Sequence, residues 1–131
     1  MTSPHLRNRY LRDSIDTASP GKLLVMLYDR LVLDLAQGEE ALRAGDRDAA
    51  ADRITHAQEI ILELRTTLDL DAWAGASGLA GLYGFLLTEL IQANIKRDAD
   101  KVASCRGIVE PLRDAWRQAA ALAITGPAPV G

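Results

Sequence analysis

Apolar residues recur at helical spacing along most of this chain, and no segment shows the apolar–polar alternation that is typical of a β-strand. Turn signals separate the periodic sequence into four stretches. The connections between these stretches are short, so consecutive helices must run antiparallel. The sequence therefore predicts an all-α fold, an antiparallel four-helix bundle with a short N-terminal arm. The expected helices cover residues 20–44, 47 to 68 or 70, 78–97 and 98–121.

Capping residues stand at the expected helix ends. Ser19 is a good N-cap, and Pro20 suits the first helical position because its missing N–H has no partner there anyway. Gly45 can adopt the left-handed conformation that closes a helix. Asp46 and Asp98 can then cap the two helices that follow.

Length and composition indicate one folded domain. The chain has 131 residues, of which 48% are hydrophobic and 25% charged, as in an ordinary globular protein. We expect the arm to cover residues 1–18, the helical bundle residues 19–122 and a mobile tail residues 123–131.

Charge and hydropathy argue against several classes of protein. The net charge of −3 disfavours a general nucleic-acid binder, since such proteins are usually basic. No stretch approaches the ~20 apolar residues that span a bilayer, and the N-terminus lacks the apolar region of a signal peptide. The single cysteine, Cys105, cannot form an internal disulfide. We expect a soluble cytoplasmic protein with no nucleic-acid partner and no membrane insertion.

Two of the expected helices carry more apolar residues than one face of a bundle needs. Their second stripes must be covered by the N-terminal arm, a second copy or a partner peptide, unless the core is simply wide. In the first helix the core stripe is Leu24, Leu27, Tyr28, Leu31 and Leu35, and the second stripe is Val25, Met26, Val32, Leu33 and Ala36 with Asp29 between them. In the third helix the core stripe is Leu79, Leu82, Tyr83, Leu86, Leu90 and Ala93, and Leu87, Ile91 and Ile95 lie on its flank.

The second and fourth helices are amphipathic in the usual way. The second is expected to present Asp52, His56, Glu59 and Glu63 to solvent. In the fourth, Pro111 falls on the polar side, where we expect a kink and not a break.

Groups that could carry catalysis are few. The chain has two histidines, too few for a di-iron site of the kind that helical bundles hold, and His56 lies on the polar face of its helix. Cys105 lies in a core stripe, which favours a small buried side chain over a nucleophile. We therefore expect no enzyme, no catalytic residue, no metal and no cofactor.

A set of short motifs resembles one protein family along about residues 10–120. Each motif is weak alone, but their order and spacing together are specific. The motifs are Tyr10, Thr17-Ala18-Ser19-Pro20, Lys22-Leu23-Leu24, Leu27-Tyr28-Asp29, Gly45-Asp46, Ala57-Gln58-Glu59-Ile60-Ile61 with Leu64, Leu68-Asp69, Leu82-Tyr83, Ala93-Asn94, Leu112-Arg113 and Ala115-Trp116. With these motifs the chain resembles the flagellar secretion chaperone FliS family.

This resemblance implies a cytoplasmic export chaperone. It would bind the C-terminal segment of flagellin, prevent premature polymerisation and deliver flagellin to the flagellar type III export gate. An anti-sigma factor is a further partner that the resemblance allows. Helical geometry and the motifs together predict three groups of partner-binding residues. They are residues on the surface of the bundle, buried residues beneath that surface (its floor), and residues of the N-terminal arm that would compete with flagellin for the surface. The surface residues are Val25, Met26, Asp29, Val32, Leu33, Leu87, Ile91 and Asn94, the floor is Tyr28 and Tyr83, and the arm residues are Tyr10, Leu11 and Ile15.

A second interpretation of the apolar stripes stays open. They could join two copies in a homodimeric bundle that has a structural or regulatory role and no client. Alternatively, a homodimer could form only when the client is absent. The two readings differ in whether a flagellin peptide binds.

Overall fold

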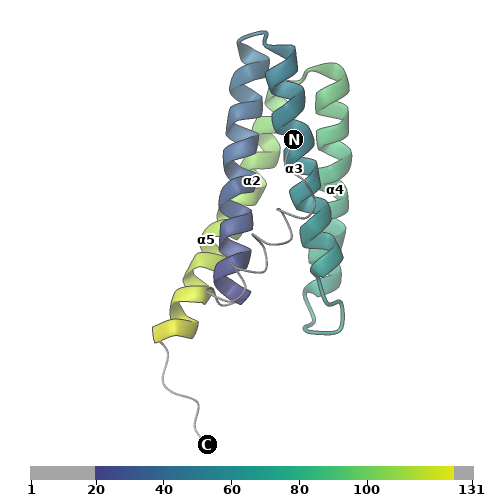
Figure 1. Cartoon of the computed structure of the whole chain (residues 1–131). Coiled ribbons are helices and arrows are strands. Elements are labelled where there is room, and N and C mark those ends of the chain that lie inside the picture. The colour runs from purple at the N-terminus through teal and green to yellow at the C-terminus, as the bar shows by residue number, and fades with distance from the viewer. Residues whose placement is uncertain (1–19, 126–131) are drawn as a thin grey trace, which may run out of the picture.

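The computed structural model describes residues 20–125, and in this part of the chain four helices form an antiparallel bundle without strands (Figure 1). The helices are α2 (Pro20–Arg43), α3 (Arg47–Thr67), α4 (Ala76–Lys96) and α5 (Ala99–Thr125). Each packs against two neighbours: α2 and α4 both contact α3 and α5, and the pairs α2–α4 and α3–α5 lie diagonally opposite. The predicted all-α bundle is confirmed.

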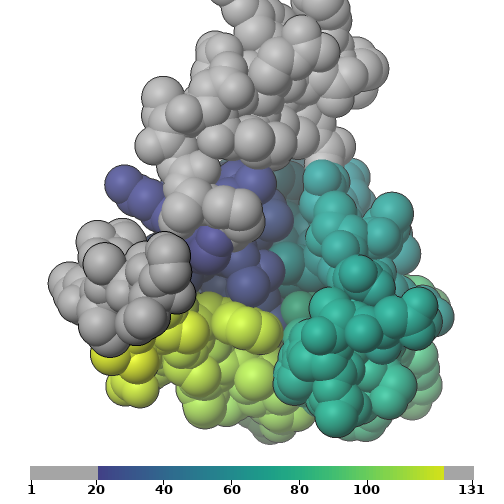
Figure 2. Space-filling model, turned by 90° about the horizontal axis from the view of Figure 1, so that it is seen from below, coloured from purple at the N-terminus to yellow at the C-terminus, as the bar shows by residue number. Residues whose placement is uncertain are grey.

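Viewed from one end of the bundle, the start of α2 and the end of α5 lie on one side, and the connection between α3 and α4 lies on the other (Figure 2). None of the helices in residues 20–125 has the length and apolar content needed to cross a bilayer.

Two of the predicted helix caps are confirmed. The Asp46 carboxylate accepts a hydrogen bond from the backbone N–H of Ala49 at 3.2 Å, and Asp98 accepts one from the N–H of Lys101 at 3.0 Å. Gly45 has a φ of 76°, the left-handed conformation that ends α2. The Ser19 cap lies outside the described residues.

The helix boundaries differ modestly from the prediction. α4 begins at Ala76, two residues before Gly78, and α5 continues to Thr125 instead of ending near Ala121. Pro111 lies inside α5 on its exposed side, as expected from the polar face. Arg97 ends α4 in the left-handed conformation with a φ of 53°, although it is not a glycine.

The core shows that α2 uses more of its surface than one stripe. Val32, placed by the helical pattern on the second stripe, is 9% exposed and packs within the main hydrophobic cluster. The expectation that Val32 lies on an exposed second stripe is therefore wrong, and we do not place it on the proposed partner-binding surface. The physical reason is that α2 lies between α3 and α5 and is buried on both sides. A core that is wider than one stripe of α2 thus explains part of the excess of apolar residues on this helix.

A buried carboxylate joins α2 to α3, and the sequence pattern gave no sign of it. Asp34 has no exposed surface. Its Oδ2 contacts Nδ1 of His56, and its Oδ1 lies 3.4 Å from Nε of Arg30 and 3.6 Å from Nη1 of Arg53. His56 therefore faces Asp34 and is only half-exposed, which corrects its assignment to a solvated polar face.

Replacing Asp34 by alanine should destabilise the bundle. The change leaves three basic side chains without the carboxylate between them. We expect a loss of about 2 kcal/mol in the free energy of unfolding; the loss stays this small because the basic groups are themselves partly solvated. Urea denaturation followed by circular dichroism measures the loss. The matched control is Asp52→Ala on the exposed surface of α3, expected to change stability by less than about 0.5 kcal/mol. Equal effects of the two substitutions would contradict this role for Asp34.

Candidate partner-binding surface

The residues predicted to bind a partner do not form one uniform surface. Tyr28 and Tyr83 are buried in the core with Val32, whereas Met26, Leu33 and Ile91 are exposed. Val25, Leu87 and Asn94 are half-buried. The predicted arm residues Tyr10, Leu11 and Ile15 lie outside the described residues.

The two tyrosines meet at the centre of the bundle. The hydroxyl oxygens of Tyr28 on α2 and Tyr83 on α4 lie 2.6 Å apart and share a hydrogen bond. Burial raises the pKa of both hydroxyls, so both stay protonated at physiological pH. The indole of Trp116 on α5 packs beside Tyr28, with ring centroids 6.3 Å apart. The pair fixes the distance between α2 and α4, beneath any partner that binds on the surface.

Asp29 is engaged within the chain. Its Oδ1 accepts a hydrogen bond from Nη2 of Arg117 at 2.7 Å and lies 3.8 Å from Nε of Arg113. Both arginines belong to α5, so Asp29 holds the second half of α5 against α2. A partner that contacted Asp29 would have to share it with these arginines.

Further ion pairs join α2 to α5 along the same side of the bundle. Glu39 of α2 accepts a hydrogen bond from Nη2 of Arg106 at 2.7 Å, and Arg43 pairs with Asp100 at 3.0 Å. The hydrogen bond from Arg106 is the main reason why the pKa of Glu39 is lowered. The α2–α5 side of the bundle is therefore occupied by internal charge pairs.

The outer face of α4, in contrast, carries exposed apolar side chains and no exposed charge. Phe85 and Ile91 are each 49% exposed and Ile95 is 75% exposed. The only charged residue between Ala76 and Ile95 is Glu89, which is half-buried and pairs with Lys101 of α5 at 2.6 Å. A solvent-facing helix surface without charge is unusual in a monomer and is typical of an interaction site.

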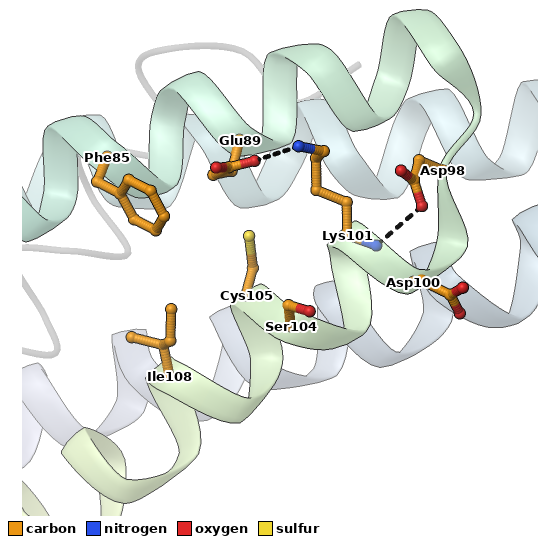
Figure 3. Close-up of a pocket in the computed structure, with 8 residues that line it drawn as sticks. All are labelled: Phe85, Glu89, Asp98, Asp100, Lys101, Ser104, Cys105 and Ile108. Carbon is orange, nitrogen blue, oxygen red and sulfur yellow. Dashed lines mark hydrogen bonds and ion pairs between the residues drawn. The ribbon is translucent and has the colours of Figure 1, made fainter.

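A hollow between α4 and α5 lies next to this face (Figure 3). Phe85 and Ile108 line one end of it, and Lys101 lines the other, where its Nζ donates a hydrogen bond to Glu89 and its backbone N–H donates one to Asp98. Cys105 lies between them, and burial raises its pKa to about 11, so the thiol is protonated at neutral pH and a poor nucleophile. Within residues 20–125 no three His, Cys, Asp or Glu side chains are grouped as metal ligands.

Comparison with known proteins decides the family. A family model described as "Flagellar protein FliS" matches residues 3–123. The chain belongs to the FliS family. The protein named Flagellar secretion chaperone FliS from Bacillus subtilis is 36% identical over 110 residues, which cover 84% of this chain and 82% of the relative. The protein of the same name from Vibrio cholerae is 32% identical over 114 residues, covering 83% and 84%.

The fold agrees with a solved structure of a flagellar chaperone. A crystal structure described as a flagellar chaperone from bacteria superimposes with a TM-score of 0.72 over 88% of this chain and 94% of that one. At 22% identity this likeness concerns the fold. The family resemblance read from the motifs is confirmed by the family model and the curated relatives.

Two features of this FliS surface were missed by sequence reasoning. Leu62 of α3 and Phe85 of α4 are each 49% exposed, and neither was placed on an apolar stripe. The long uncharged run of α4 was a signal that could have directed attention to Phe85.

The Tyr28–Tyr83 pair should behave as a unit when it is mutated. Tyr28→Phe or Tyr83→Phe alone leaves one buried hydroxyl without its partner, at a cost of about 1–2 kcal/mol in unfolding free energy. The double variant should lose less than the sum of the two single losses, with a coupling of about 1 kcal/mol. Chemical denaturation of the four proteins measures this cycle. Additive losses would show that the hydroxyls do not depend on each other.

Cys105 should react slowly in the folded protein. A pKa of about 11, compared with an unfolded value near 9, lowers the thiolate fraction at pH 8 about 100-fold, and burial slows access further. Alkylation by iodoacetamide should therefore be at least about 100-fold slower in buffer than in denaturant. The control Cys105→Ser with Ser104→Cys moves the thiol to an exposed neighbour and should restore fast labelling. Rapid labelling of native Cys105 would contradict its placement.

Proposed function

We propose that this FliS-family chain is a cytoplasmic export chaperone that binds the C-terminal segment of flagellin. It keeps that segment from polymerising early and delivers it to the flagellar type III export gate. The observation that carries this proposal is the family match across residues 3–123, which covers the described bundle except for the last two residues of α5. We also propose that the protein performs no catalysis, which its membership of a chaperone family supports.

The proposed flagellin surface is apolar and discontinuous. Met26 and Leu33 lie two helical turns apart on the exposed side of α2, and Leu87, Ile91 and Asn94 lie on α4. Half-buried Val25 adjoins the first group, and the Tyr28–Tyr83 pair is the floor beneath. Residues Tyr10, Leu11 and Ile15 are proposed to compete with flagellin for this surface.

The binding mode that we propose is capture of an extended or helical peptide in apolar grooves. A flagellin tail that folds as it binds loses conformational entropy, so several separate contacts are needed for useful affinity. Since α2 and α4 are not neighbours, a segment that reaches both groups of residues would have to wrap around the bundle, which supplies more contacts than a single pocket would. The complex is then delivered to the export gate. We do not include an anti-sigma factor in the proposal, because no contact among the described residues favours one.

Calorimetric titration with a flagellin C-terminal peptide from the same genome tests the function. We expect one-to-one, sub-micromolar binding with a negative heat-capacity change, because apolar surface is buried. The double variant Met26→Asp with Ile91→Asp should weaken binding at least tenfold, since each change places a charge on an exposed apolar contact. Val32→Asp is unsuitable as a test because Val32 is a core residue.

The matched control is Gln37→Asp with Thr66→Asp, two exposed positions outside the proposed surface. It should bind like the unmodified protein. Unchanged affinity of the Met26 and Ile91 variant would place the groove elsewhere. An absence of heat at several temperatures, together with a tight dimer in light scattering, would favour the alternative of a homodimeric bundle without a client.

A further inference from the structure

Two large apolar side chains are exposed in the connection between α3 and α4, residues 68–75. Leu70 is 58% exposed and Trp73 is 49% exposed. The connection reads Leu-Asp-Leu-Asp-Ala-Trp-Ala-Gly, so it carries two carboxylates and no basic residue. Tryptophan is among the residues most enriched at the energetic centres of protein interfaces, and binding residues often lie on loops held by a rigid scaffold. The connection therefore has the composition of a binding element.

Hydrogen bonds within the connection hold it in one shape. The Asp69 carboxylate accepts a hydrogen bond from the backbone N–H of Asp71 at 3.0 Å. The N–H of Ala72 donates to the carbonyl of Asp69, and the N–H of Ala76 donates to the carbonyl of Trp73, each at 3.2 Å. A segment that is already ordered loses little conformational entropy when a partner binds to it.

Gly75 sets the position of the Trp73 indole. A β-carbon added at Gly75 would overlap the six-membered ring of Trp73, so this ring lies directly against the glycine backbone. Gly75 has a φ of −83° and a ψ of −5°, which residues other than glycine also adopt. The close approach of the indole, and not the backbone conformation, therefore requires a glycine here. The ring is supported on one side while about half of the Trp73 surface stays in solvent.

We propose that Leu70 and Trp73 form an anchor for the client, which takes an apolar side chain of flagellin that has a basic residue beside it. This inference rests on the proposed function and adds to it a contact at one end of the bundle. Leu70 and Trp73 supply the apolar contact. The exposed Asp69 and Asp71 supply the charge that favours a Lys or Arg of the client next to it.

The route of the client around the bundle favours this position. α2 and α4 are not neighbours, so a segment that binds to both passes over α3, over α5 or around one end. The boundaries of α2 with α3 and α5 carry the charged groups around Asp34 and Asp29. At one end the connections 44–46 and 97–98 contain no large apolar residue, whereas Leu70 and Trp73 are exposed at the other. Apolar contact is thus available around the end that holds residues 68–75.

The distances suit a short stretch of client. The start of α2 and the connection between α3 and α4 lie at the same end of the bundle, on opposite sides of it (Figures 1 and 2). Met26 lies six residues after the start of α2, about 9 Å along the axis at ~1.5 Å per residue. Two helix-to-helix distances amount to ~20 Å, which roughly six to eight extended residues span.

Calorimetric titration of the full chain with the flagellin C-terminal peptide tests the anchor. Trp73→Ala should raise the Kd at least about tenfold, because the indole contact is lost. Gly75→Ala should raise it at least about threefold, since the added methyl group displaces the indole although Trp73 is still present. The matched control is Leu122→Ala, which removes another exposed apolar side chain near the end of α5 and should leave the Kd unchanged. Circular dichroism verifies that each variant is folded.

Tryptophan fluorescence tests the contact directly. The chain has two tryptophans, so Trp116→Phe leaves Trp73 as the only one. A tryptophan-free peptide at saturation should shift the Trp73 emission to shorter wavelength and reduce its quenching by iodide, because the bound client covers the indole.

The salt dependence of binding tests the charge. Asp71→Asn should raise the Kd at low ionic strength about two- to threefold and reduce its further rise with added salt, because one attraction to the basic residue is lost. Asp52→Asn, exposed on α3, is the control and should change neither. The same salt dependence in Asp71→Asn and in the unmodified protein would overturn the assignment of a basic residue to the client.

The outcomes separate the anchor from the function on which it rests. An unchanged Kd for Trp73→Ala, equal effects of Trp73→Ala and Leu122→Ala, or a Trp73 emission that the peptide does not alter would overturn the anchor while flagellin binding stands. An absence of binding by the unmodified protein would contradict the proposed function, and the anchor with it.

Discussion

The arrangement of the bundle depends on one hydrogen bond between its diagonal helices. α2 and α4 are not neighbours, since each packs only against α3 and α5. Tyr28 and Tyr83 are long enough to reach the centre from both sides, and their hydroxyls meet there at 2.6 Å. A buried hydroxyl without a partner is costly, so each tyrosine specifies the position of the other. The spacing between α2 and α4 is therefore fixed from the interior of the bundle.

Polar groups fix the sides of the bundle in two different ways. Between α2 and α3 the charge is buried, since Asp34 is fully enclosed while its three basic partners remain partly exposed. Between α2 and α5 the ion pairs of Asp29 and Glu39 lie nearer the solvent, where each contributes little alone. α2 is thus tied on both sides, which explains why Val32 is buried. α4 shares fewer such ties and keeps its uncharged face outward.

Sequence reasoning could predict the features that depend on local geometry. Helical spacing, the caps at Asp46 and Asp98 and the left-handed Gly45 are decided within a few residues, and the structure confirms them. Val32, His56 and Asp34 depend instead on which helices lie beside α2, and spacing within one helix does not encode its neighbours. Arg30 and Arg53 look like ordinary solvated charges until the fold brings Asp34 between them. The motifs indicated the family but gave no information on any of these contacts.

The uncharged face of α4 is best understood from the conflict that an export chaperone of this family faces. A surface that captures an apolar segment must itself be apolar, but an exposed apolar surface promotes aggregation. The exposed large apolar side chains of α4, which are Phe85, Ile91 and Ile95, are separated by small or polar exposed residues such as Gly81 and Thr88, which limits the size of each apolar patch. The glycines of α4, each costing about 1 kcal/mol of helix propensity relative to alanine, are consistent with a partner's side chains approaching the backbone there.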